Sequence, residues 1–130
     1  MTKIIASGQR RSPRFSPRRP NACTGSANGC AWLDDLAAVA DAPARQRAQD
    51  WVFDWIRRYR WGGGPGWTPD LTGRRLIRWI NHAILLLNGR SRAESDAYFR
   101  CLGQQTIFLA RRWRKAAPGL PRFEALTGLI

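Results

Sequence analysis

The sequence predicts an all-α fold built from antiparallel helical hairpins, and two observations support this prediction. Apolar residues recur every three or four positions through most of residues 30–130, and no segment shows the alternation of a strand. Short segments rich in Gly and Pro, such as residues 61–69, separate these stretches and are typical of loops. Short connections favour antiparallel packing of neighbouring helices. The periodicity suits a bundle, an α-solenoid or an α/α toroid equally well.

A first helix is expected over residues 31–40. Asp41 has the side chain of an N-cap and Pro43 suits a first helical turn, so a second helix is expected to follow. The apolar residues of this second helix form an aromatic stripe of Ala44, Ala48, Trp51, Val52, Trp55, Ile56 and Tyr59.

A third helix is expected to begin at Asp70 or Thr72 and to end at Asn88-Gly89. Ser91 and Glu94 have the spacing of a capping box, which starts the next helix. A last helical segment is expected from Pro121. The residues expected to face the core are Leu76, Ile77, Ile80, Ala83, Ile84 and Leu87, then Tyr98, Phe99, Leu102, Thr106, Leu109 and Trp113, and finally Phe123, Leu126 and Ile130.

Charge and composition separate residues 1–29 from the rest. The chain carries 22 Lys and Arg against nine Asp and Glu, a net charge of +13. Residues 1–29 are rich in Arg, Pro, Ser and Gly, contain no acidic residue and show no apolar period, so we expect a disordered basic tail. Such a tail is either simply solvated or an arm for nucleic acid. The 44% hydrophobic residues and seven Trp exclude a chain that is disordered throughout.

The sequence offers little for metal or disulfide chemistry. Cys23, Cys30 and Cys101 have no paired spacing and there is one histidine, so we expect no zinc site, no disulfide framework and no cofactor. Cys101 lies in an apolar helical register and is interpreted as a core residue. No segment reaches the roughly 18 apolar residues of a membrane span. The first residues also lack the apolar run of about 7–15 residues that a secretory signal needs.

Tryptophans and arginines gather between residues 61 and 79. Tryptophan faces stack on sugar rings or bases, and guanidinium groups pair with carboxylates, sulfates or phosphates. Core aromatics beside a solvated arginine face would give the same pattern. The group consists of Trp61, Trp67, Arg74, Arg75, Arg78 and Trp79, and the candidate substrate-binding residues are Trp67, Arg74, Arg78 and Trp79.

Asn81-His82 is the one place in the sequence with a candidate for acid–base chemistry, because His82 is the only histidine. A lone histidine on a largely apolar helix is also typical of a hydrogen-bonded core or edge residue. No second histidine or carboxylate cluster accompanies it, which argues against a metal site.

Five segments carry a resemblance to a known family, namely AWLDDL (31–36), WVFDWI (51–56), GWTPDLTGRRLIRWINHA (66–83), FLARRW (108–113) and PGLPRFEALTGL (118–129). Through them, residues 30–130 resemble the heparinase II/III-like proteins of Gram-negative bacteria. The resemblance implies an N-terminal α/α toroid followed by a C-terminal β-sandwich region. It further implies a polysaccharide lyase that acts by β-elimination at uronic acids, and a periplasmic location would fit it.

In this family a Tyr and a His act as base and acid, while an amide or similar group neutralises the uronate carboxylate. Neutralisation is needed because the neighbouring proton is only weakly acidic until the carboxylate charge is offset. The catalytic Tyr and His lie beyond the stretch matched here, so the resemblance assigns no catalytic residue, and Asn81 and His82 are candidates only for lining the cleft. We therefore expect residues 30–130 to be an N-terminal toroid fragment, inactive alone, whose partner is an acidic polysaccharide.

Two other interpretations stay open. A small basic helical nucleic-acid-binding protein would fit the charge of +13 and the arginine-rich tail. Against it stand the acidic residues of the first helices and the lack of a basic recognition helix. A gene remnant without function is the third interpretation, since the chain stops at Ile130 inside an apolar pattern and residues 1–29 do not resemble the family.

Overall fold

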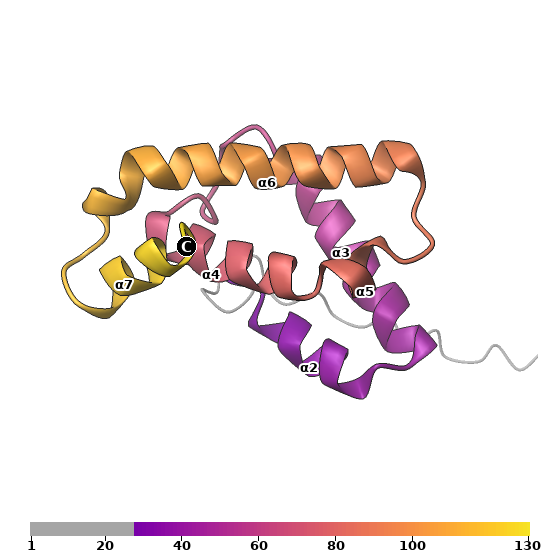
Figure 1. The fold of residues 1–130 in the computed structure, drawn as a ribbon. Coiled ribbons are helices and arrows are strands. Elements are labelled where there is room, and N and C mark those ends of the chain that lie inside the picture. Colours follow the sequence, from indigo (N-terminus) through magenta and orange to yellow (C-terminus); the bar gives the residue numbers. More distant parts are fainter. Residues whose placement is uncertain (1–27) are drawn as a thin grey trace, which may run out of the picture.

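A computed structural model describes residues 28–130, and this part of the chain is all-α and contains no strand, as predicted (Figure 1). The predicted tail of residues 1–29 lies outside the described residues, except for Asn28 and Gly29. The elements in chain order are α2 (Ala31–Val39), α3 (Ala42–Tyr59), α4 (Pro69–Asn81), α5 (Ala83–Leu87), α6 (Arg92–Arg112), the 3₁₀ helix η1 (Trp113–Lys115) and α7 (Leu120–Thr127).

The capping residues start their helices where the sequence predicts. The Oδ1 atom of Asp41 accepts a hydrogen bond from the backbone N–H of Ala44 at 2.7 Å, at the start of α3. At the start of α6, the backbone N–H of Glu94 donates to Ser91 Oγ, and the backbone N–H of Ser91 donates to Glu94 Oε2. This reciprocal pair is the predicted capping box, so both helix starts are confirmed.

The helices α4 and α6 form an antiparallel pair. The hydroxyl of Tyr98 donates to the carbonyl of Trp79 at 2.6 Å, and Arg75 Nε donates to Gln105 Oε1 at 2.6 Å. Gln105, the later of the two α6 residues, thus contacts Arg75, the earlier of the two α4 residues. The two helices therefore run in opposite directions. In Figure 1, α6 lies along one side of α4, α2 lies towards the other side, and α7 lies beside the N-terminal half of α4. One antiparallel helical pair of the predicted kind, α4 with α6, is therefore present.

The buried face of the third predicted helix differs from the expected one. A single helix was expected up to Asn88, but the structure divides it at His82 into α4 and α5. Ile80 is exposed and Ile84 is 91% exposed, whereas Trp79 is fully buried. The expected stripe through the two isoleucines was wrong, because the helix turns the much larger indole of Trp79 into the core instead.

The core-facing residues of the last two helices were predicted in part. Tyr98 and Leu109 of α6 are fully buried, as expected. Phe99, Thr106 and Phe123 were expected to face the core but are exposed. Cys101 is buried, as expected, and the small Ala125, which was not among the expected core residues, is fully buried. Small side chains let neighbouring helices approach closely, and a hydrophobicity pattern gives them little weight.

The closest approach of α4 and α7 depends on two glycines. A Cβ atom added to Gly73 would overlap the backbone carbonyl of Glu124, and one added to Gly128 would lie 2.7 Å from the Cα atom of Gly73. Neither position has room for a side chain. The salt bridge between Arg74 and Glu124, at 2.6 Å, joins the same two helices. The C-terminal helix is therefore part of the packed fold.

Replacing Gly73 with Ala should lower the free energy of unfolding by about 1–3 kcal/mol, because the new methyl group forces α4 and α7 apart. Gly103→Ala in α6 is the matched control, since a Cβ there meets nothing within 4 Å. That control should be neutral or stabilising by up to about 1 kcal/mol from helix propensity. Urea denaturation followed by circular dichroism measures both. Equal stability of the two variants would contradict the close approach.

Candidate functional site

The two predicted tryptophans have different surroundings. Trp79 is fully buried, its ring is stacked on Tyr98 with 5.7 Å between centroids, and the edge contact with Trp55 is 5.5 Å. In this fold Trp79 has no surface to offer a ligand, which corrects the prediction made for it. Trp67 is only partly buried, and its indole N–H donates to the carbonyl of Tyr59 at 2.7 Å.

The two predicted arginines join helices within the fold. Arg74 pairs with Glu124 of α7. Arg78 Nε lies 2.8 Å from Asp34 Oδ2 of α2, and Arg78 Nη1 donates to the carbonyl of Gly29 at 2.9 Å. Gly29, which the composition placed in the tail, therefore belongs to the packed part. Both arginines remain partly exposed, and their binding to a ligand stays a prediction.

His82 also contacts Asp34. Its Nε2 atom lies 2.9 Å from Asp34 Oδ1, while Asn81 is exposed at the end of α4. Within residues 28–130 no hydrogen bond joins His82 to a tyrosine, and the Tyr98 hydroxyl donates to a backbone carbonyl instead. Residues 28–130 therefore bring no tyrosine to His82, and the acidic group beside it is the carboxylate of Asp34.

The pKa of Asp34 reflects two opposing effects. Partial desolvation raises it, but the hydrogen bonds from Arg78 and His82 outweigh this and place the pKa of the carboxyl below its ordinary value of 3.8. Because the folded pKa is lowered, the ionised carboxylate contributes stability above the unfolded pKa. That contribution is lost as the pH falls through the folded pKa.

Asp34→Asn should therefore lose stability relative to the wild type at neutral pH, and the difference should shrink as the pH falls from about 5 to about 2. The side chain of Asp34 is 51% exposed, so solvent screens the pair and the effect should be small. Asp35→Asn is the control, because Asp35 forms no ion pair with the described residues. Denaturation across this pH range measures both variants. A pH-independent difference for Asp34→Asn would contradict the role assigned to its carboxylate.

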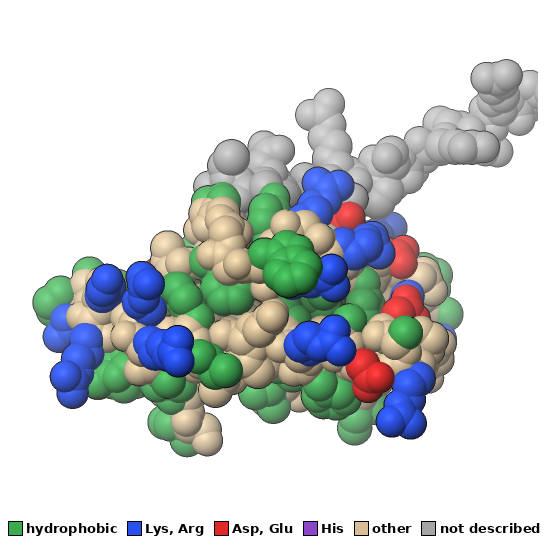
Figure 2. All heavy atoms as spheres, turned by 90° about the horizontal axis from the view of Figure 1, so that it is seen from above, with side chains coloured by type: hydrophobic (Ala, Val, Ile, Leu, Met, Phe, Trp, Pro, Cys, Tyr) green, Lys and Arg blue, Asp and Glu red, His purple; other side chains and the backbone are tan. Residues whose placement is uncertain are grey.

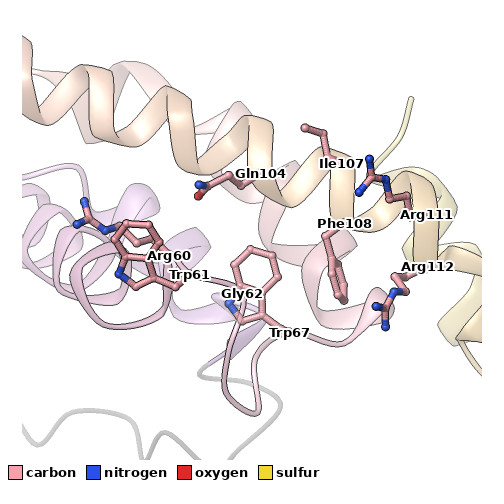
Figure 3. A pocket seen from close by; sticks show the side chains of 9 residues that line it. All are labelled: Arg60, Trp61, Gly62, Trp67, Gln104, Ile107, Phe108, Arg111 and Arg112. Carbon is pink, nitrogen blue, oxygen red and sulfur yellow. The ribbon is translucent and has the colours of Figure 1, made fainter.

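A groove lies where the C-terminal end of α3 and the loop after it face α6. Its volume is about 290 Å³. Figure 3 shows Gln104 and Phe108 of α6 turned towards the loop that carries Trp61 and Trp67, with Arg111 and Arg112 further along the helix. The lining residues are Arg60, Trp61, Gly62, Trp67, Gln104, Ile107, Phe108, Arg111 and Arg112.

Aromatic rings form much of the lining. Trp67 meets Phe108 edge-on, with ring centroids 5.2 Å apart, and this contact joins the loop to α6. Trp61 is 76% exposed, and the guanidinium of Arg60 lies over its ring at 4.4 Å from the centroid. Trp61 therefore offers an open aromatic surface with a cation beside it.

The groove is cationic and has no compensating acid. No Asp or Glu lines it, and in the described part of the chain no ion pair joins Arg60, Arg111 or Arg112 to a carboxylate. Arg60 Nε is buried and has no hydrogen-bond partner among the described residues. In Figure 2, Lys and Arg side chains gather at the end of the molecule where α6 ends, away from the acidic side chains. These features suit an anionic ligand with an apolar face.

Sequence reasoning found part of this groove. It predicted Trp67 and named Trp61 in the wider group, but it missed Arg60, Arg111 and Arg112. One signal was available, because residues 97–123 include six Lys and Arg residues and no Asp or Glu. Their meeting with Arg60 depends on the fold.

Other chemistry is sparse in the described part of the chain. No group of three His, Cys, Asp or Glu residues in positions 28–130 could bind a metal ion. Burial raises the pKa of the Cys30 and Cys101 thiols, so both stay protonated, and the core interpretation of Cys101 is confirmed. None of the helices in this region is long and apolar enough to cross a membrane. Comparisons of the chain with protein families, curated proteins and solved structures found no match.

Proposed function

We propose that this chain is a helical part of a heparinase II/III-like polysaccharide lyase and that its groove binds acidic polysaccharide. The observation that carries the proposal is a cavity lined by three arginines and by aromatic rings, without a carboxylate. Guanidinium groups pair in bidentate fashion with uronate carboxylates and with sulfates. The apolar face of a sugar ring packs on an open indole such as that of Trp61.

The arrangement of the helices supports the same proposal. An α/α toroid is built from antiparallel helical hairpins, and the pair α4 and α6 has this geometry. The helices α2 and α3, joined by a short connection, also pack against each other through the edge-on contact of Trp32 and Trp51, whose ring centroids are 4.9 Å apart. The helical pairs support the packing expected of a toroid. The toroid itself and the lyase reaction are proposed from the family resemblance of residues 30–130.

Nucleic acid is the competing ligand, and the charge of +13 favours it. Proteins that bind single strands stack successive bases on several open aromatic faces. Of the aromatic residues that line the groove only Trp61 is largely exposed, because Trp67 is partly buried against Phe108 and Tyr59. Because the groove offers one open stacking surface and not several, we favour a glycan over a single-stranded nucleic acid as its ligand.

The role that we assign to the chain is substrate binding, not proton transfer. His82 does not line the groove, and its Nε2 already contacts Asp34. The chain alone should therefore give no turnover of heparan sulfate, alginate or hyaluronan. Absorbance of the unsaturated uronate product measures this. Turnover clearly above a buffer blank would contradict the assigned role.

Binding tests the proposal itself. The double variant Arg111→Gln, Arg112→Gln should weaken binding of hyaluronan or heparan sulfate about tenfold or more, because two charge-assisted contacts are lost. The control variant Arg45→Gln, Arg92→Gln removes the same charge outside the groove and should retain most of the affinity. Calorimetric titration at about 50 and 200 mM salt separates specific binding from non-specific electrostatic attraction, which weakens steeply as the salt concentration rises. Equal losses in both variants would contradict a specific groove.

A further inference from the structure

The groove continues beyond the first cavity. A second, smaller cavity of about 40 Å³ shares Arg60, Trp61 and Gln104 with the first one. It adds Arg100, together with Ala97 and Cys101, all from the N-terminal half of α6. The shared residues place the two cavities next to each other along α6.

The residues of α6 that line the two cavities share one face of the helix. Arg100, Gln104, Ile107 and Arg111 are separated by four, three and four positions, which is the spacing of a single helical face. The rise of an α-helix separates the Cα atoms of Arg100 and Arg111 by about 16 Å along the axis. The two cations therefore mark the ends of an elongated site.

The charges along this site have no acidic partners within residues 28–130. Arg100, like Arg60 and Arg111, forms no ion pair there, whereas Arg74, Arg78 and Arg90 on other surfaces each pair with an acid. Several other arginines, including Arg92 at the start of α6, are thus paired with acids, whereas those that line the two cavities are available. An anionic ligand would find guanidinium groups at both ends of the site and one more, Arg60, between them.

Polar and apolar groups occupy the middle of the site. Gln104 points from α6 towards the side formed by Arg60 and Trp61 (Figure 3). Its amide can both donate to and accept from sugar hydroxyls. The exposed ring of Trp61 can pack against the apolar face of a sugar. A sugar with its hydroxyls and one apolar face matches this pair of groups.

We propose that the two cavities form one extended subsite for an unbranched, uronate-containing oligosaccharide that lies along α6. Its negative charges pair with Arg100, Arg60 and Arg111, and one sugar ring packs on Trp61. The inference rests on the proposed function and adds a minimum ligand length. In hyaluronan every second sugar carries a carboxylate, so a disaccharide offers one charge and cannot pair with both terminal arginines. A tetrasaccharide offers two charges, and a hexasaccharide offers one for each of the three arginines.

The test uses the full 130-residue chain and hyaluronan oligosaccharides of two, four, six and eight sugars, titrated calorimetrically at about 50 and 200 mM salt. Affinity should rise at least tenfold from the disaccharide to the tetrasaccharide and change little beyond the hexasaccharide. Arg100→Gln should remove most of that step. Trp61→Ala should weaken the tetrasaccharide at the same salt dependence, since no charge is lost.

Arg92→Gln is the matched control, because it removes the same charge from the same helix. Its side chain is 94% exposed and lies outside both cavities. Arg100 is also exposed, so both variants should fold, and circular dichroism checks this. The control should keep the full step in affinity between the disaccharide and the tetrasaccharide.

Three results would overturn the extended subsite. In the first, affinity rises smoothly with ligand charge and Arg100→Gln equals Arg92→Gln. The proposed function then survives if the Arg111 and Arg112 variant still weakens polymer binding. In the second, no uronate glycan of any length binds, and the proposed function fails as well. In the third, an oligonucleotide of equal charge outcompetes every glycan in all variants, which identifies the ligand as nucleic acid.

Discussion

The fold depends on one buried cation, Arg75, which lies on the inner face of α4 and has no exposed surface. No carboxylate in residues 28–130 pairs with it. Its guanidinium donates instead to Gln105 Oε1, to Thr72 Oγ1 and to the carbonyls of Asn28 and Gly66. It also lies over the ring of Trp55, 4.1 Å from the centroid. Burial lowers the pKa of Arg75 to about 10, so it stays charged at neutral pH.

These contacts explain how the chain tolerates a buried charge and why the groove keeps its shape. Removing an ion from water costs several kcal/mol, which each hydrogen bond from a charged donor offsets by about 1.5–3 kcal/mol. The bond to Gly66 fixes the residue before Trp67, and the bond to Gln105 fixes the residue after Gln104. Both neighbours line the groove. The same cation thus sets the distance between the loop and α6.

The sequence predicted the local features of the fold and missed those that arise from packing. The caps at Asp41 and Ser91 depend on residues only three positions apart, so their spacing predicted them. Arg75 interrupts an apolar pattern, and the pattern alone predicts a solvated residue, because its acceptors Gln105 and Asn28 lie far away in sequence. Contacts between residues far apart in sequence also bury Trp79, and because a local pattern does not show such contacts, Trp79 was predicted to bind a ligand. For the groove, local composition predicted Trp67, whereas the meeting of Arg60 with Arg111 required the fold.

The proposed binding of an acidic glycan along α6 beside Trp61 is tested most directly by the indole N–H signals of the seven tryptophans. During titration of the ¹⁵N-labelled chain with a hyaluronan hexasaccharide, the signal of Trp61 should shift most and that of Trp67 less. The signal of the buried Trp79 should stay in place. The largest shift at Trp32 or Trp51, which lie away from the groove, would contradict the proposal, and so would no shift at any tryptophan.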